Sequence, residues 1–338
     1  MERLEQMNTR NQDLVGVVII ARNEGERLKR CLASVLDQAD KIVYVDSGSS
    51  DGSVAYAQSL NIDTLLLDMS TPFSAARARN EGYRRLMKQH PDIHYVQFID
   101  GDCELIPGWL DAAEKHLSTH PSCAIVAGRR KERFPEATLY NFFCDLEWNT
   151  PVGEARSCGG DFMVRQSAFN DVNGFNPVVI AGEEPELCFR LRKKGWIIYR
   201  LDQLMTVHDA AITHFSQWWK RSMRGGHAYA QGFSLHGQDK ERYCLRESSR
   251  IWFWAVILPI LISLLALSLH PALISLALIY PIQILRMALA SDSRILDRRR
   301  SLIYAFFIML GKWPEMVGQL LFIKRKLLMS RLSIIEYG

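Results

Sequence analysis

Short apolar runs alternate with amphipathic stretches over the first 120 residues of the chain. Such alternation is typical of βαβ units, in which helices join the strands of a parallel sheet. The apolar runs predict strands at Leu14–Ala21, Lys41–Asp46, Thr64–Leu67 and His94–Asp100. The amphipathic stretches predict helices at Glu26–Asp37, Asp51–Ser59 and Ala75–Lys88. The pattern therefore predicts an α/β fold with a mostly parallel sheet, whose ligands bind at the carboxyl ends of the strands.

Residues 122–237 mix both kinds of pattern. They include a helical stretch at Glu184–Lys194, an apolar run at Ile197–Tyr199 and a glycine turn that ends in Asp161. We expect this region to complete the same domain, which then spans residues 14–240. Residues 1–13 are a polar tail without the apolar core that a secretory signal needs.

The composition changes abruptly after residue 250. Residues 251–285 contain no Asp, Glu, Lys or Arg. One membrane-spanning helix needs about 20 apolar residues, so an extension to residue 290 gives room for two. A turn at His270–Pro271 then predicts a transmembrane helical hairpin over residues 251–290. The alternative, a helix pair buried in a soluble protein, conflicts with the length of the run and its missing polar face.

An arginine-rich loop follows the hairpin. Its arginines are Arg294, Arg298, Arg299 and Arg300. Basic loops remain in the cytoplasm, so we expect the catalytic domain at the cytoplasmic face of the inner membrane. Residues 301–323 are apolar but carry a charged interruption at Lys312–Glu315, and the basic run Lys324–Lys326 follows them. This pattern predicts that residues 301–332 form amphipathic helices lying in the membrane interface. A third crossing of the membrane is the alternative.

The overall composition excludes two classes of protein. Hydrophobic residues make up 48% of the 338 residues and the net charge is only +4, so neither a disordered chain nor a nucleic-acid-binding protein is indicated. The seven cysteines form no CxxC pair, which argues against a disulfide framework and a zinc site. Reduced thiols are the simplest interpretation.

The first two predicted strands end in short polar turns. Backbone N–H groups and small polar side chains at such turns bind nucleotides, and a carboxylate accepts hydrogen bonds from a base or ribose. The candidate nucleotide-binding residues are Ala21, Arg22, Asn23, Glu24, Asp46 and Ser49. Simple N-capping of the next helix by Ser50 or Asp51 is the alternative.

The strand that begins at His94 ends in Asp100–Gly101–Asp102, a DxD motif. Two carboxylates around a flexible glycine suit Mn²⁺ or Mg²⁺, which take oxygen ligands from one or two carboxylates and from substrate phosphates. A solvated acidic turn is the alternative. The DxD motif follows two turns of the kind that bind nucleotides, and this position favours the metal site.

Taken together, these motifs resemble those of family 2 glycosyltransferases with the GT-A fold, over Val15 to Gly232. The matching motifs are the Asn23–Glu24 turn, the acidic turn at 46–51, the segment Ala76–Asn80 and the DxD motif. The resemblance implies a nucleotide-diphosphate sugar as donor. It places Asp46 near the base, Arg79 near the nucleotide, and Asp100 and Asp102 at the ribose and the metal.

The acidic catalytic motif of that family resembles the stretch from Gly182 to Arg190. Glu184 stands where the family usually has Asp, and it is the candidate general base, with Glu183 and Glu186 as rivals. Acidic residues that only stabilise the first turn of a helix are the alternative.

Several downstream residues complete the candidate site. His208 resembles the third metal ligand of many GT-A enzymes, and His214 is a weaker candidate. Guanidinium groups suit phosphates, so Arg221 and Arg224 are candidates for holding a diphosphate or the acceptor, unless they face lipid headgroups. Asp161 and Trp218 are further candidates for this role.

These residues predict an inverting, metal-dependent transfer of a sugar to an acceptor hydroxyl. The membrane segment favours a lipid-linked glycan as acceptor and membrane lipids as partners, in the synthesis of cell-surface polysaccharide or glycolipid. Transfer to a polyprenyl phosphate and processive chain extension are the alternatives among enzymes. The alternative from another class is an inactive GT-A module that binds nucleotide or acts as a scaffold.

Overall fold

The computed structural model describes residues 14–290 and 297–328, which form two compact units that divide between Thr213 and His214. The expected polar tail, Arg294 and the last residues of the 301–332 segment lie outside the described residues. The helix after His214, which we expected within the catalytic domain, belongs to the second unit.

The first unit is built on a nine-stranded mixed sheet. Its strands are β1 (Val15–Ala21), β2 (Ile42–Asp46), β3 (Asp63–Leu66), β4 (Tyr95–Asp100), β5 (Cys103–Leu105), β6 (Cys123–Glu132), β7 (Gly153–Ala155), β8 (Phe162–Arg165) and β9 (Ile197–His208). The order is β3-β2-β1-β4-β8-β6-β9-β5, and β7 pairs with β9. Strands β3, β2, β1 and β4 are parallel, whereas β8 is antiparallel to both of its neighbours. The four predicted strands are confirmed to within one residue at each end.

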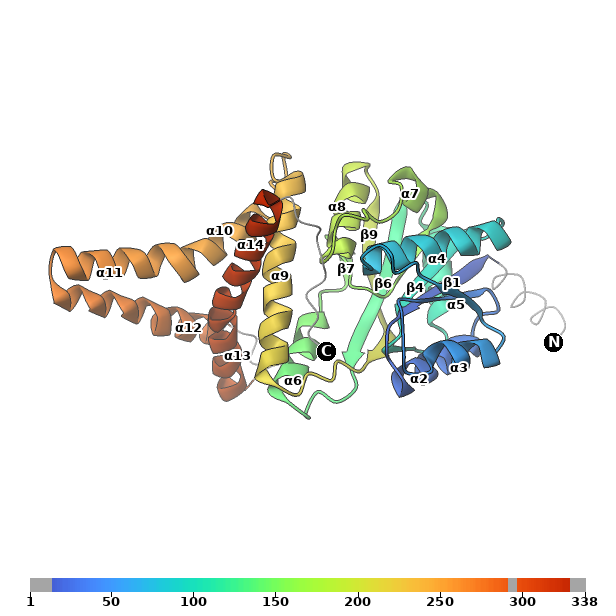
Figure 1. Ribbon diagram of the computed structural model, residues 1–338, viewed down its shortest axis with the longest axis horizontal. Helices are drawn as coiled ribbons and strands as arrows, with labels where there is room; N and C mark the ends of the chain where they lie inside the picture. The colour runs from blue at the N-terminus through green and yellow to red at the C-terminus, as the bar shows by residue number, and fades with distance from the viewer. Residues whose placement is uncertain (1–13, 291–296, 329–338) are drawn as a thin grey trace. The chain divides into compact units, whose positions relative to one another are not determined.

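Helices cover both faces of this sheet (Figure 1). They are α2 (Glu26–Leu36), α3 (Ser53–Ser59), α4 (Ala75–Gln89), α5 (Trp109–Thr119), α6 (Leu139–Trp148), α7 (Gln166–Asp171) and α8 (Glu183–Lys193). Val17 and Ile19 pack in a core with α2, α3 and α5, while Val18 packs on the opposite face in a core with α4, α7 and α8. Because both faces are buried, β1 is a continuous apolar run rather than an alternating one.

Helix α4 is held close to the sheet at its start and middle. Ser74 caps the helix through its Oγ, which accepts a hydrogen bond from the N–H of Arg77 over 3.2 Å. A Cβ atom on Gly82 would lie 2.5 Å from Val18 Cγ1, so only glycine allows this approach. The first turns of α4, which carry Arg79, are therefore fixed against β1.

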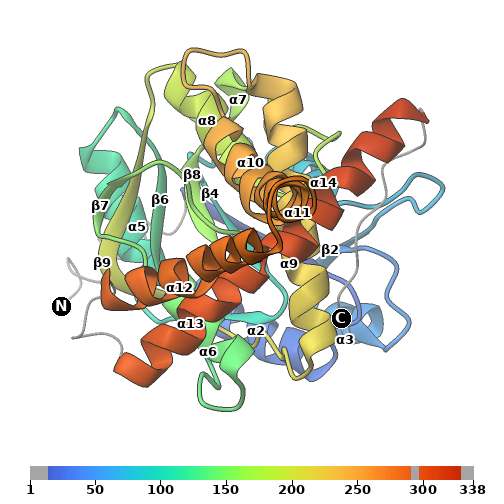
Figure 2. The ribbon, with the colours of Figure 1, turned by 90° about the vertical axis from the view of Figure 1, so that its left-hand side faces the viewer.

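The second unit is helical. Its elements are α9 (Phe215–His236), α10 (Leu245–Trp252), the π-helical turn η1 (Phe253–Ile257), α11 (Leu258–Ser268), the 3-10 helix η2 (Pro271–Leu278), α12 (Ile279–Ala290), α13 (Arg298–Leu310) and α14 (Lys312–Leu327). Helices α9 and α14 cross in close contact (Figure 2). A Cβ atom on Gly226 would clash with the carbonyl oxygen of Glu315, and one on Gly318 would clash with that of Met223. Glycine at both positions therefore permits the crossing.

Three segments of the second unit are long and apolar enough to cross a membrane, by length and composition alone. They are Leu245–Ser268, Pro271–Ala290 and Arg298–Leu327. His270 of the predicted turn lies between the first two segments and Pro271 begins the second, and the transmembrane hairpin stays a prediction. The third segment is the least apolar, with a mean hydropathy of 1.3 against 2.4 for the first, and it divides at Gly311. Its placement in the membrane interface stays a prediction.

Candidate active site

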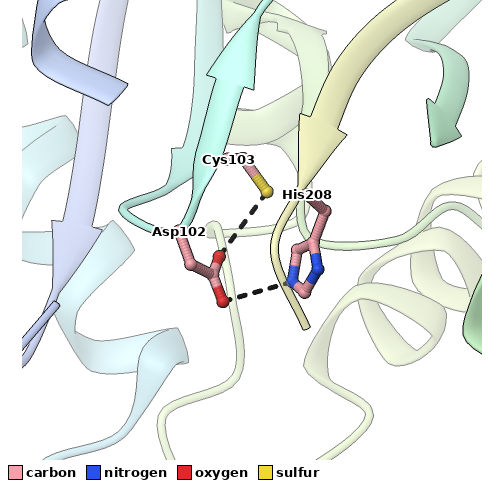
Figure 3. A group of neighbouring side chains, drawn as sticks. All are labelled: Asp102, Cys103 and His208. Atoms are coloured by element: carbon pink, nitrogen blue, oxygen red, sulfur yellow. Dashed lines mark hydrogen bonds and ion pairs between the residues drawn. The ribbon is translucent and has the colours of Figure 1, made fainter. Parts of the chain in front are cut away.

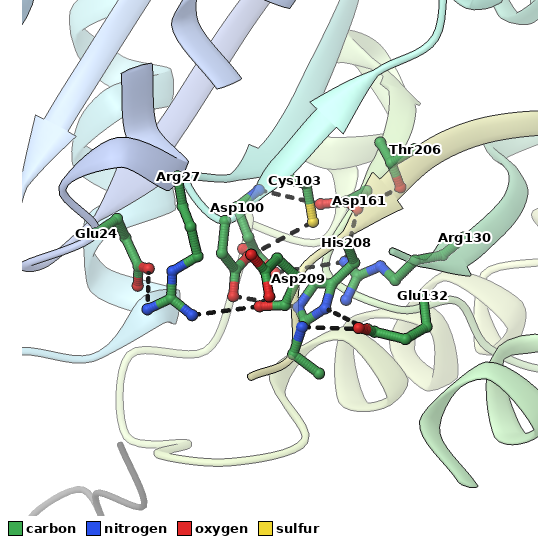
Figure 4. A network of polar contacts seen from close by, with 12 residues as sticks. Glu24, Arg27, Asp100, Cys103, Arg130, Glu132, Asp161, Thr206, His208 and Asp209 are labelled. Carbon is green, nitrogen blue, oxygen red and sulfur yellow. Dashed lines mark hydrogen bonds and ion pairs between the residues drawn. The ribbon is translucent and has the colours of Figure 1, made fainter. Parts of the chain in front are cut away.

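The carboxyl ends of β1, β2 and β4 lie next to one another in the sheet. Ala21 pairs with Asp46 across β1 and β2, and Ile20 pairs with Asp100 across β1 and β4. The turns that follow these strands therefore meet, and the polar network around the DxD motif forms there (Figure 4). This is the sheet edge at which parallel α/β proteins bind ligands.

The turns after β1 and β2 are cross-linked by hydrogen bonds. The N–H of Asn23 donates to Ser49 Oγ over 2.9 Å, and the N–H of Ser50 donates to Asn23 Oδ1 over 2.8 Å. Asn23 has a φ of 56°, a left-handed conformation that Asn adopts more readily than most residues. The two predicted nucleotide-binding turns thus form one preformed surface.

Asp46 organises the second of these turns. Its Oδ1 accepts hydrogen bonds from the N–H groups of Gly48 and Ser49 over 2.9 and 2.8 Å, and its Oδ2 accepts one from the Tyr44 hydroxyl over 2.6 Å. The residue is only 2% exposed. The carboxylate therefore fixes the turn beside the expected base position, and its contact with a base stays a prediction.

Arg79 joins the DxD motif to the acidic motif at the start of α8. Its Nη2 lies 2.7 Å from Asp100 Oδ1, and its Nη1 lies 2.9 Å from Glu184 Oε1 and 3.2 Å from Glu183 Oε1. The Arg79 side chain is 2% exposed, so the guanidinium lies buried among three carboxylates. A planar guanidinium carries its N–H groups on separate nitrogens in a fixed fork, so it can hold carboxylates on both sides, whereas an ammonium has all its donors on one nitrogen. The predicted contact of Arg79 with the nucleotide stays a prediction.

The three acidic residues at the start of α8 have different surroundings. Glu186 accepts hydrogen bonds from Arg190 at 2.8 to 2.9 Å, so its carboxylate is fully occupied. Glu183 is buried, whereas the Glu184 side chain keeps 14% of its surface exposed. Burial and the neighbouring charge of Glu183 raise the pKa of Glu184 to about 7, although Arg79 opposes the increase. Glu184 is thus the candidate base whose carboxylate is partly open and titrates near neutrality.

Asp161 holds the DxD motif in place through hydrogen bonds and an ion pair. Its Oδ1 accepts a hydrogen bond from the N–H of Asp100 over 3.0 Å, and its Oδ2 accepts one from the Thr206 hydroxyl over 2.8 Å. Arg130 Nη2 lies 2.8 Å from the same Oδ2 and 3.4 Å from Asp100 Oδ2. The Asp161 side chain is fully buried. These contacts stabilise the position of the DxD motif. The predicted contact of Asp161 with acceptor or diphosphate stays a prediction.

Asp102 and His208 face each other, as the predicted metal site requires. His208 Nε2 lies 3.2 Å from Asp102 Oδ2, and His208 Nδ1 lies 3.7 Å from Glu132 Oε2. Burial alone lowers the pKa of His208, but the charge and hydrogen bond of Asp102 raise it to about 9. The Cys103 thiol lies beside them, and the carboxylate oxygen, sulfur and imidazole nitrogen lie within 4.8 Å of one another (Figure 3). This donor set fits a divalent transition-metal ion.

Glu24 extends the acidic cluster on the side of the first turn. It forms an ion pair of 2.7 Å with Arg27, whose Nη1 also donates to the carbonyl oxygen of Asp209 over 3.2 Å. Burial and the charge of Asp102 raise the pKa of Glu24 to about 7. Burial is the larger cause, and the carboxylates of the DxD motif add to it.

The remaining candidates lie in the second unit, on or beside α9. Trp218 is buried there, and its ring meets that of Phe307 edge to face at a centroid distance of 5.0 Å. His214 is the N-cap of α9. Arg221 and Arg224 lie on the same helix. Their roles at a diphosphate, an acceptor or lipid headgroups stay predictions.

Three residues of the site were missed by sequence reasoning. Arg130 and Glu132 lie in the charged run that ends β6 directly after an apolar run, and charged residues at the end of a strand were a usable signal. Cys103 gave no signal, because its neighbour His208 lies far away in the sequence and meets it only through the pairing of β5 with β9.

Comparisons with known proteins agree with this arrangement. Residues 16–172 match the glycosyl transferase family 2. The glycosyltransferase AglE of Haloferax volcanii is 24% identical over 258 residues, which cover 72% of this chain and 80% of AglE. The pre-mycofactocin glycosyltransferase of Mycobacterium tuberculosis is 26% identical over 63% of this chain, which spans 46% of that relative. Among solved structures, the mannosyltransferase PcManGT from Pyrobaculum calidifontis has a TM-score of 0.62 at 15% identity, covering 91% of this chain and 87% of PcManGT.

The sheet topology and the likeness to PcManGT show a GT-A fold. The match to the family model and to curated relatives identifies the enzyme class as glycosyltransferase. Within that class, residues 16–172 match the glycosyl transferase family 2. The fold and enzyme class predicted from the sequence are confirmed.

Proposed function

We propose that this glycosyltransferase moves a sugar from a nucleotide-diphosphate sugar to a lipid-linked acceptor at the cytoplasmic face of the inner membrane, with inversion at the anomeric carbon. The observation that carries the proposal is the Arg79 bridge, which holds Asp100 and Glu184 on either side of one guanidinium. A donor bound at the DxD motif would therefore lie close to Glu184, because only the Arg79 guanidinium separates the two. The Glu184 carboxylate can accept a proton.

The donor side of the site is formed by the strand-end turns. The N–H groups and small side chains around Asn23 and Ser49 suit a nucleotide, with Asp100 near the ribose. Asp102 and His208 would hold Mn²⁺ or Mg²⁺, which supplies Lewis-acid stabilisation of the departing diphosphate. PcManGT, a structural neighbour, was solved with GDP-mannose and Mn²⁺, which supports a donor and metal of this kind.

The acceptor side of the site contains the base. Glu184 removes the proton of the acceptor hydroxyl as the oxygen attacks the anomeric carbon, and its pKa of about 7 leaves a large fraction ionised at neutral pH. Glu183 is buried and paired with Arg79, and Glu186 is paired with Arg190, so neither carboxylate is as open. Glu184 is accordingly our choice of base.

The helical unit supports the choice of a lipid-linked acceptor. Two of its segments are long enough to form a transmembrane hairpin, and the arginines at the start of α13 favour a cytoplasmic location for the chain that precedes it. An enzyme fixed to the membrane meets acceptors that are confined to the same membrane. Arg221 and Arg224 would hold a diphosphate or an acceptor phosphate.

The experiment uses the full chain in lipid nanodiscs. Nucleotide-sugars are first screened with Mn²⁺ for thermal stabilisation, and the best donor is then incubated with lipid-linked glycans while mass spectrometry measures the product. One added sugar on a lipid-linked glycan supports the proposal. Transfer to a bare polyprenyl phosphate, or many added sugars, would replace it by one of the alternative enzymes. Donor binding without transfer or hydrolysis would indicate an inactive scaffold.

A further inference from the structure

Cys103 faces the proposed metal ligands because of the register of two strands. It is paired with His208 across the antiparallel strands β5 and β9. Directly opposed residues of an antiparallel pair place their side chains on the same face, with Cβ atoms about 4.5–5.5 Å apart. Asp102, the residue before Cys103, turns its carboxylate toward both side chains (Figure 3).

The separations between the donor atoms suit a single ion. Cys103 Sγ lies 3.6 Å from Asp102 Oδ1, and His208 Nε2 lies 3.2 Å from Asp102 Oδ2. A thiolate about 2.3 Å and an oxygen or nitrogen about 2.0–2.2 Å from one tetrahedral ion lie roughly 3.5–3.7 Å from each other. The sulfur therefore already lies at a ligand's distance from the carboxylate.

We propose that Cys103 is a third protein ligand of this site, so that the site selects a thiophilic transition-metal ion over Mg²⁺. The inference rests on the proposed function, because it assigns a ligand to the metal site proposed there. The chemical reason is the donor set: Mg²⁺ requires hard oxygen ligands, whereas nitrogen and sulfur donors favour later transition metals. The thiol loses its proton to solvent as the metal–sulfur bond forms.

The test measures metal binding by the full chain without any donor. Co²⁺ bound to a thiolate has an intense sulfur-to-metal absorption that oxygen and nitrogen ligands do not produce. We expect this absorption to saturate in the unmodified chain and to disappear in Cys103→Ser. We also expect the preference for Cd²⁺ over Mg²⁺ to fall more than about tenfold in Cys103→Ser, since loss of even an outer-shell partner costs about 10–100-fold in metal affinity.

The matched control is Cys244→Ser, which removes a half-buried thiol of the helical unit and should change neither measurement. Cys103→Ala takes the place of the serine variant if serine prevents folding. The proposal is overturned if the sulfur-to-metal absorption persists in the variant that lacks Cys103. It is also overturned if Co²⁺ binds to the unmodified chain but produces no such absorption. In either case, thermal stabilisation by Mn²⁺ would still support the metal site proposed on Asp102 and His208, without Cys103 as a ligand. If no divalent ion binds to the folded chain, both the ligand and the proposed metal site are wrong.

Discussion

Replacing Arg79 by lysine tests whether Glu184, the proposed base, is positioned through the DxD motif. Lysine keeps one positive charge but offers a compact ammonium in place of a planar group with two N–H edges. The contacts at 2.7 Å to Asp100 and 2.9 Å to Glu184 use different nitrogens of Arg79, so lysine keeps at most one of them well. Arg79→Lys should therefore fold, with one carboxylate released.

The size of the effect follows from burial. A hydrogen bond to a charged group is worth about 1.5–3 kcal/mol, so the loss of one contact should lower the free energy of unfolding by about that amount. A displacement of the reacting group by about 1 Å can cost about 100-fold in rate, so we expect kcat to fall by that order while the donor KM changes little. A residue that acted only on the nucleotide would show the opposite pattern.

The pH dependence provides a second readout. Burial and Glu183 raise the pKa of Glu184 from 4.5 to about 7 while Arg79 opposes them, so the acid limb of kcat/KM lies near pH 7 and should move to higher pH in Arg79→Lys. Because the folded-state pKa is raised, the stabilising contribution of Glu184 is complete below about pH 4.5 and is lost as the pH rises through about 7.

The control for this experiment is Arg85→Lys. Arg85 also holds a carboxylate with two nitrogens, both 2.9 Å from Asp63, but on the surface of the domain. It should leave kcat and the pH profile unchanged. The reasoning is refuted if Arg79→Lys raises the donor KM strongly at normal kcat, or if only its thermal stability falls.

Three further predictions concern the base, the metal and the topology. Glu184→Gln should lower kcat by about 10²–10⁴-fold with little change in donor affinity. A larger loss in Glu183→Gln would identify Glu183 as the base instead. Asp102→Asn should abolish transfer and the thermal stabilisation by Mn²⁺, and full activity of this variant or of the enzyme in EDTA would contradict a metal site. Cysteines at Glu154 and Arg298 should react with an impermeant maleimide only after the membrane is opened, and reaction of one of them in intact cells would refute the hairpin.

The sequence predicted the parts of the fold that depend on local pattern. Strands such as β1 are short apolar runs bounded by polar turns, and their limits could be read to within one residue. The helix at Glu183–Lys193 was also found, because its acidic first turn and apolar spacing are local features. Long strand β9 was predicted only over Ile197–Tyr199, since Arg200, Asp202 and Gln203 interrupt its apolar run.

The contacts within the site depend on pairing between distant segments, and these could not be predicted. The resemblance to a family placed Arg79 beside the nucleotide, whereas the structure shows which carboxylates it contacts. Those contacts arise because α4 packs on β1 while α8 begins on the same face of the sheet. Cys103 meets His208 for a similar reason, through the register of β5 and β9.

The charges of the site predict that donor and metal bind cooperatively. Each buried cation is already shared: Arg79 contacts three carboxylates, Arg130 contacts Asp100 and Asp161, and His208 lies between Asp102 and Glu132. The donor diphosphate brings further negative charge to a site whose cations are already paired with carboxylates. The affinity of the donor should therefore depend on a bound divalent ion. Linkage requires the reverse effect to be equal, and such couplings typically amount to about 5–150-fold. Calorimetric titration of donor with and without Mn²⁺, and of Mn²⁺ with and without donor, should give the same factor, and a donor affinity that is independent of the metal would show that the buried arginines suffice.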